Sequence, residues 1–135
     1  MIKKIEHLGI AVQNIEESNA LFAKLLNIPP YKMEVVEREG VMTSFFQVGE
    51  SKVELLQATN EESPIARYLE KNKQGIHHIA FDVDDIHAEM ERLVNEGFVL
   101  LSQDPKPGAD GKIIVFLHPK STNGVLIELC QDARI

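Results

Sequence analysis

Residues 76–83, Ile-His-His-Ile-Ala-Phe-Asp-Val, nearly repeat residues 5–12, Ile-Glu-His-Leu-Gly-Ile-Ala-Val. A histidine occupies the third position of both copies, His7 in the first and His78 in the second. A later pair of segments also matches, because Val-Glu-Leu-Leu-Gln at 53–57 resembles Ile-Glu-Leu-Cys-Gln at 127–131. The chain therefore reads as one module written twice, and a two-fold repeat of this length predicts a pseudo-symmetric domain rather than a solenoid.

The first copy is predicted to follow the order β-α-β-β-β. Residues 4–12 favour a strand, and a helix at 15–26 follows because Asn14 can cap its start and Pro29 lies just beyond its end. Turns then separate three further strands. These strands are expected at 31–37, 41–48 and 52–57. The apolar stripe that the helix is expected to bury consists of Ile15, Leu21, Phe22, Leu25 and Leu26.

The second copy repeats this order after a short linking helix at 64–71, which Ser63 can cap. A longer helix is predicted from Asp85 to near Gly97. Its inward-facing residues are expected to be Ile86, Met90, Leu93 and Val94. Its strands are expected at 76–83, 98–102, 113–117 and 125–130. The segment 105–111 is rich in proline and glycine and is predicted to be a loop that can act as a lid.

These elements define an α+β fold in which two tandem βαβββ modules form a pseudo-two-fold, cleft-shaped mixed sheet. With 135 residues, 44% of them hydrophobic, the chain can bury the core of one domain. We expect a single domain over 1–135. Its parts are a first module at about 1–60, a linker helix at about 63–72 and a second module at about 75–135.

Composition excludes several classes of partner. A net charge of −7 and a pI near 5.2 disfavour nucleic acid and anionic membrane surfaces, which need clustered Lys and Arg. Cys130 is the only cysteine, so an intramolecular disulfide and a cysteine-based zinc site are both excluded. No apolar run approaches membrane-spanning length, and the N-terminus lacks a signal-peptide core. We expect a cytoplasmic protein that binds neither nucleic acid nor membrane.

The repeat places one histidine on the first strand and one glutamate on the last strand of each module. If equivalent strands face each other across a shared cleft, these four side chains converge. Two imidazoles and two carboxylates without a thiolate favour a divalent transition metal that keeps positions open for substrate. The predicted ligands are His7, Glu54, His78 and Glu128.

Taken one at a time, these residues are more often ordinary strand residues than metal ligands. Their recurrence at matching places favours the metal site, and so do the hydrophobic neighbours of Glu54 and Glu128, because a buried carboxylate needs a partner. The other histidines are expected to have structural or surface roles. His77 must point to the strand face opposite His78, His87 to the exposed side of a helix, and His118 lies in a loop.

Five short segments together carry a resemblance to a known family. They are Glu-Ser-Pro-Ile-Ala at 62–66, Gly-Ile-His-His-Ile-Ala at 75–80, Val-Asp-Asp-Ile at 83–86, Leu-His-Pro-Lys at 117–120 and Gly-Val-Leu-Ile-Glu-Leu at 124–129. With them the chain resembles the vicinal-oxygen-chelate superfamily of glyoxalases, bleomycin-resistance proteins and dioxygenases. Within that superfamily it is most similar to enzymes that epimerise methylmalonyl-CoA.

The resemblance implies a function for the predicted site. It implies epimerisation of methylmalonyl-CoA, a small acyl-CoA substrate, at C2 through a metal-stabilised enolate, in a homodimer. The implied cofactor is a divalent metal ion, Co²⁺ ahead of Zn²⁺, Mn²⁺ or Ni²⁺, on residues matching His7, Glu54, His78 and Glu128. The implied catalytic carboxylate is Glu128, with Glu54 a candidate for the opposite face. Some family members carry a glutamate base where this chain has Thr43.

Two alternative functions use the same scaffold. A lactoylglutathione lyase-like isomerase would also move a proton through a metal-bound enediolate. A non-catalytic binding protein would hold a small ligand without turnover. The presence of both His and both Glu favours an enzyme over the binding protein, and the choice of substrate separates the two enzymes.

Overall fold

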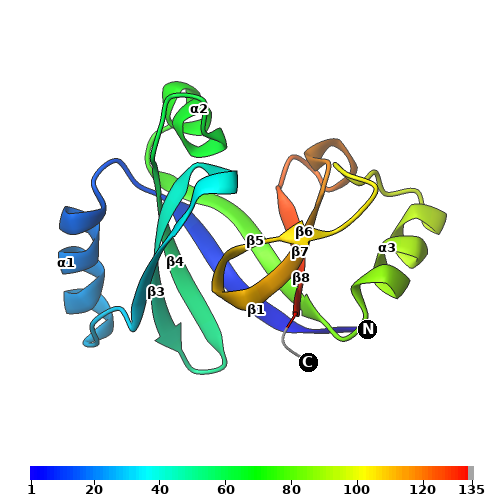
Figure 1. Ribbon diagram of the computed structural model, residues 1–135, viewed down its shortest axis with the longest axis horizontal. Coiled ribbons are helices and arrows are strands. Elements are labelled where there is room, and N and C mark those ends of the chain that lie inside the picture. The colour runs from blue at the N-terminus through cyan, green and yellow to red at the C-terminus, as the bar shows by residue number, and fades with distance from the viewer. Residues whose placement is uncertain (134–135) are drawn as a thin grey trace. The chain divides into compact units, whose positions relative to one another are not determined.

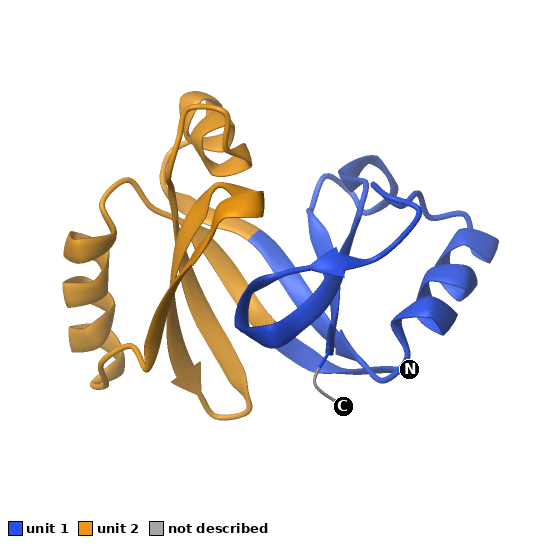
Figure 2. Cartoon of the chain, in the orientation of Figure 1, with its two compact units in different colours: residues 1–6, 78–135 blue, residues 7–77 orange. Residues whose placement is uncertain are grey.

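The computed structural model describes residues 1–133, so residues 134–135 of the predicted second module lie outside the described residues. The described chain divides into two compact units, one formed by residues 7–77 and the other by residues 1–6 with the chain from His78 onward (Figure 2). The division runs through the strands β1 (Ile2–Ala11) and β5 (Gly75–Val83), so each unit contains part of both.

The unit of residues 7–77 contains the predicted βαβββ order. Its strands lie in the order β2-β3-β4-β1, with β1 parallel to β4 and the remaining pairs antiparallel. After β1 its elements are α1 (Ile15–Leu26), β2 (Lys32–Val36), the 3-10 turn η1 (Glu37–Glu39), β3 (Val41–Val48), β4 (Ser51–Ala58) and α2 (Pro64–Lys71). The predicted α+β class and the predicted order of elements in the first copy are therefore confirmed.

Side chains at the helix ends explain why the predicted helix limits are confirmed. The Asn14 side chain accepts a hydrogen bond from the Glu17 N–H at 3.1 Å and caps α1. Ser63 Oγ accepts from the Ile65 N–H at 3.2 Å and caps α2. Within residues 1–133, no helix combines the length and the apolar character that a bilayer crossing requires.

The two faces of this sheet carry separate cores. On one face α1 covers β3 and β4 (Figure 1), and the buried residues there are Val12, Ile15, Phe46 and Leu55. On the other face α2 packs over Ala11, Val41 and Leu56 through Ile65. Because residues on a strand alternate between faces, the second face is also the one that carries His7 and Glu54.

The other unit repeats the arrangement, with strands in the order β5-β8-β7-β6. The pair β5 and β8 is parallel, and β7 is antiparallel to both β8 and β6. Its further elements are α3 (Ile86–Asn95), β6 (Lys106–Pro107), η2 (Ala109–Gly111), β7 (Lys112–Leu117), η3 (Pro119–Ser121) and β8 (Ile127–Asp132). Ile86, Met90 and Leu93 of α3 face inward, as predicted, and share one buried cluster with Val115 and Leu129.

The prediction of a strand at 98–102 is wrong. Only Leu100 pairs, as an isolated bridge to Leu117, while Leu101 and His118 donate single backbone hydrogen bonds between the two segments. The strand that continues the sheet beside β7 is instead β6, Lys106–Pro107, inside the segment predicted to be a loop. A strand this short, containing a proline and next to a glycine, leaves no alternating pattern in the sequence.

The predicted apolar helix faces were too wide. Leu21 and Leu25 are 59% and 69% exposed on α1, and Val94 is 52% exposed on α3. At 100° per residue, Leu25 and Leu21 lie roughly 80° and 120° away from the line through Ile15, Phe22 and Leu26. A sheet covers only the central part of a helix face, so these side chains remain in solvent.

Candidate functional site

Strand pairing brings His7 to Glu54. In the parallel pair of β1 and β4, Glu54 lies beside Gly9. His7 precedes Gly9 by two residues on β1, so its side chain lies on the same sheet face as that of Glu54. His7 Nδ1 lies 3.1 Å from Glu54 Oε2. Both residues are buried, with 5% and 4% of their surface exposed. This contact follows directly from the β1–β4 register.

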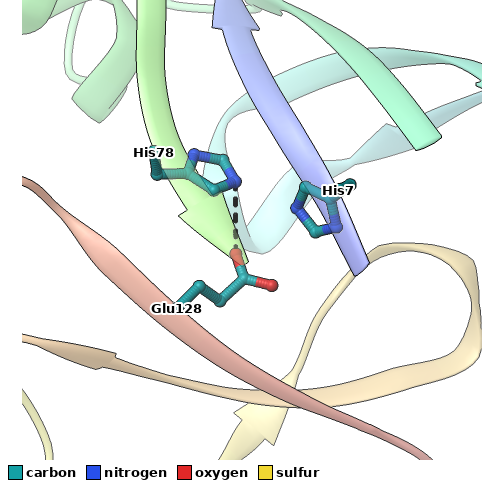
Figure 3. Close-up of side chains that lie close together, drawn as sticks. All are labelled: His7, His78 and Glu128. Carbon is teal, nitrogen blue, oxygen red and sulfur yellow. Dashed lines mark ion pairs between the residues drawn. The ribbon is translucent and has the colours of Figure 1, made fainter. Parts of the chain in front are cut away.

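The same arrangement brings His78 to Glu128 in the other unit. Glu128 lies beside Ala80 in the parallel pair of β5 and β8, and His78 is again two residues earlier. His78 Nε2 lies 3.3 Å from Glu128 Oε1. Figure 3 shows this pair, joined by a dashed line, together with the His7 side chain. The internal repeat of the sequence is therefore also a repeat of a buried His–Glu pair.

Burial makes these pairs chemically unusual. His78 and Glu128 are each 5% exposed, and the ring of Phe116 meets the His78 imidazole edge-on with centroids 5.8 Å apart. A carboxylate removed from water is costly unless it is paired or coordinates a metal. Each unit therefore holds a buried pair of one imidazole and one carboxylate.

The distances within each pair fit a metal ion. Two ligands on one transition-metal ion, each at roughly 2.0–2.2 Å, lie roughly 2.8–3.6 Å apart for angles between a right angle and the tetrahedral angle. The nitrogen-to-oxygen distances of 3.1 Å and 3.3 Å lie within that range. Nitrogen and oxygen donors without a thiolate are typical of an open site for cobalt, zinc, manganese or nickel. They are less typical of a closed structural zinc site, which usually contains cysteine.

The remaining histidines have other roles, as predicted. The imidazole of His77 is half-buried and meets the Tyr68 ring edge-on at 5.1 Å, and this burial lowers the pKa of His77. His118 Nδ1 accepts a hydrogen bond from the Lys120 N–H at 3.0 Å and so fixes the turn after β7. His87 is exposed on α3.

The only cysteine has no place in the site chemistry. Cys130 is fully buried in β8. This burial is the main cause of a strong rise in the pKa of its thiol, and the nearby charge of Glu128 is the second cause. A thiol that stays protonated is neither a nucleophile nor a metal ligand at neutral pH. Cys130 therefore acts as a small core residue.

Lys32 and Glu34 of β2 and Thr43 of β3 lie on the sheet face that carries His7 and Glu54. The sequence did not predict that the two residues of β2 lie there. Phe45 lies opposite Glu54, and Lys32 lies opposite Phe45 with Nζ 5.6 Å from the ring centroid. Lys32 Nζ also pairs with Glu34 Oε1 at 3.1 Å. The sequence contains no signal for this arrangement, because the β2–β3 register decides which residues share the face.

The sequence matches a recognised superfamily over most of its length. Residues 6–116 match the Glyoxalase/Bleomycin resistance protein/Dioxygenase superfamily. The chain belongs to this superfamily, which confirms the resemblance drawn from the sequence.

Within the superfamily the similarity is to acyl-CoA epimerases. The chain is 43% identical over 133 residues to ethylmalonyl-CoA/methylmalonyl-CoA epimerase of Cereibacter sphaeroides, covering 97% of this chain and 99% of the relative. It is 42% identical to the mitochondrial methylmalonyl-CoA epimerase of Dictyostelium discoideum, covering 95% and 78%. A variant of Streptomyces coelicolor methylmalonyl-CoA epimerase, solved with 2-nitronate-propionyl-CoA, superposes with a TM-score of 0.95 at 32% identity, covering 100% and 98%.

Proposed function

We propose that this chain is an isomerase that epimerises methylmalonyl-CoA at C2 and so interconverts its (R) and (S) forms. The observation that carries the proposal is the buried imidazole–carboxylate pair repeated in the two units, His7 with Glu54 and His78 with Glu128. Similarity to methylmalonyl-CoA epimerases over 95% of the chain or more supports the choice of substrate.

The proposed cofactor is one divalent metal ion bound by both pairs together, Co²⁺ ahead of Zn²⁺, Mn²⁺ or Ni²⁺. The support is the donor chemistry and the ligand-like distances inside each pair. When bound, such an ion polarises a thioester carbonyl and stabilises the negative charge that develops as the α-proton leaves. The protein's part is to hold the four donors away from water.

The proposed proton chemistry begins with Glu128. Its carboxylate takes the proton from C2 on one face of the substrate and returns it there, so Glu128 is both ligand and acid–base group. Glu128 is 5% exposed, so its carboxylate has few contacts with bulk water before substrate binds. Inversion also requires a group on the opposite face, and Glu54 is the first candidate because it is the other carboxylate of the proposed site.

We also propose that the protein is a cytoplasmic homodimer. The support for the dimer is the family resemblance. A single, buried cysteine accords with a reducing compartment.

Deuterium exchange at C2 tests the proposed function. In D₂O, the Co²⁺-loaded protein is expected to place deuterium at C2 of methylmalonyl-CoA and to interconvert the epimers. Treatment with a chelator should abolish both reactions, and added Co²⁺ should restore them. The hemithioacetal of methylglyoxal and glutathione serves as the competing substrate. Turnover of the hemithioacetal without exchange into the acyl-CoA would contradict the proposal and identify a lactoylglutathione lyase-like isomerase.

A further inference from the structure

Thr43 carries a buried hydroxyl that needs a partner. The residue is 0% exposed, and among the described residues its Oγ1 has no hydrogen-bond partner. Buried hydroxyls in native proteins are nearly always hydrogen-bonded, because an unpaired one costs free energy. The Thr43 hydroxyl can therefore form a hydrogen bond with a group that arrives with the substrate or through a side-chain movement. Ser44 Oγ, on the opposite face of β3, is likewise without a partner among the described residues.

The strand register places Thr43 on the face of the His7–Glu54 pair. In the antiparallel pair of β3 and β4, Phe45 lies opposite Glu54, and Thr43 is two residues from Phe45. Directly opposed residues share a face, and so do residues two apart on a strand. Thr43 thus neighbours the proposed catalytic face without contacting either member of the pair through a hydrogen bond.

A carboxylate lies one strand further out on the same face. Glu34 on β2 lies directly opposite Thr43. The position of the Lys32 Nζ, 5.6 Å from the Phe45 ring centroid and 3.1 Å from Glu34 Oε1, agrees with this placement. Side chains opposed in this way have Cβ atoms roughly 4.5–5.5 Å apart, so the Glu34 carboxylate can reach the Thr43 hydroxyl by rotating about its own side-chain bonds.

Glu34 is also accessible, which the site carboxylates are not. Its side chain is 30% exposed, whereas the Glu54 and Glu128 side chains are each 6% exposed. This exposure lets Glu34 exchange a proton with solvent directly between turnovers. Glu34 therefore has both the position and the exposure of an acid–base residue.

We propose that Glu34 is the acid–base residue for the face of the substrate opposite Glu128, and that Thr43 is the positioning residue that orients it. This inference rests on the proposed epimerase function. With substrate bound, the Glu34 carboxylate turns from Lys32 toward Thr43 and accepts a hydrogen bond from the Thr43 hydroxyl. Glu54 then remains a metal ligand and takes no part in proton transfer.

The proton balance of the step is simple. For one epimer, the C2–H bond breaks toward Glu34, an O–H bond forms on its carboxylate, and the electron pair stays on the substrate as an enolate. Protonation of the opposite face by Glu128 then gives the inverted product. Glu34 has gained one proton and Glu128 has lost one, and exchange with solvent restores both.

Variants at three glutamates separate the candidates, with Glu34→Gln, Glu54→Gln and the exposed control Glu37→Gln compared in D₂O. Glu34→Gln is expected to slow inversion by roughly 100-fold or more. In the epimer whose C2 proton Glu128 removes, the variant should still incorporate deuterium at C2 without inverting the configuration. Elemental analysis should show that it retains its metal. Glu54→Gln changes a proposed metal ligand, so any loss of turnover should follow its metal content and affect exchange in both epimers equally. Glu37→Gln should invert at the wild-type rate.

Two results would overturn the assignment of Glu34. One is inversion by Glu34→Gln at the wild-type rate, and the other is loss of inversion in Glu54→Gln with exchange kept in one epimer. Failure of the proposed function itself looks different, because the wild-type protein would then exchange neither epimer. The two failures are therefore distinguishable in one set of measurements.

Thr43 is tested by substitutions that differ only in the hydroxyl. Thr43→Val should lower kcat by about 10-fold with KM unchanged, because it removes the donor that orients Glu34. Its melting temperature should equal or exceed that of the wild type, since the hydroxyl has no hydrogen-bond partner among residues 1–133. Thr43→Ser should restore kcat. Wild-type kcat in Thr43→Val would show that the hydroxyl has no positioning role.

Discussion

Replacing His78 by alanine is expected to remove most of the bound metal and to lower the epimerisation rate at least about 100-fold. Mutating groups that only support metal ligands already costs about 10–100-fold in affinity or activity, and His78 is proposed to be a ligand itself. Metal content by elemental analysis and turnover of methylmalonyl-CoA measure the two effects. The loss should be only partly reversed by excess Co²⁺, because one donor is permanently absent.

The matched control for this prediction is His87→Ala, which removes an exposed imidazole from α3. It should retain metal and activity. Since His78 is buried beside Glu128, His78→Gln and circular dichroism distinguish loss of a ligand from loss of the fold. A folded His78→Ala protein with wild-type metal content would rule out His78 as a ligand.

Replacing Glu128 by glutamine is expected to separate metal binding from proton transfer. The amide keeps an oxygen donor at the same place but cannot accept a proton at neutral pH. We expect kcat to fall by roughly 10²–10⁴-fold, which is the range that general acid–base groups supply. Metal content should fall far less than turnover. Isotope exchange at C2 should disappear in the epimer that Glu128 serves.

Equal losses of metal and turnover in Glu128→Gln would contradict the acid–base role and leave Glu128 as a ligand only. Full turnover would exclude both roles. Together with His78→Ala, this variant decides which member of the buried pair contributes to binding and which to chemistry.

The sequence predicted the elements whose limits are set by local chemistry. The α1 and α2 helices begin where the Asn14 and Ser63 side chains accept backbone hydrogen bonds, and both caps are visible in the sequence. The predicted strand at 98–102 failed because local β propensity does not ensure a partner strand. Likewise, helical periodicity does not reveal how much of a helix the sheet covers, which is why Leu25 and Val94 were misplaced.

The sequence predicted those residues of the candidate site that recur in both copies of the repeat. His7 and His78 stand at matching positions, and parallel pairing with the last strand of each module brings each to its glutamate. Glu34 could not be predicted, since its relation to Thr43 depends on the β2–β3 register. That register is set by turn geometry and packing, so no spacing in the sequence encodes it.

The most direct test of the central claim is a crystal structure of the Co²⁺-loaded protein, with diffraction recorded on both sides of the cobalt absorption edge. We expect one anomalous peak per chain, at roughly 2.0–2.2 Å from donor atoms of His7, Glu54, His78 and Glu128. Separate peaks at the two His–Glu pairs, or a peak that none of these residues contacts, would contradict the central claim.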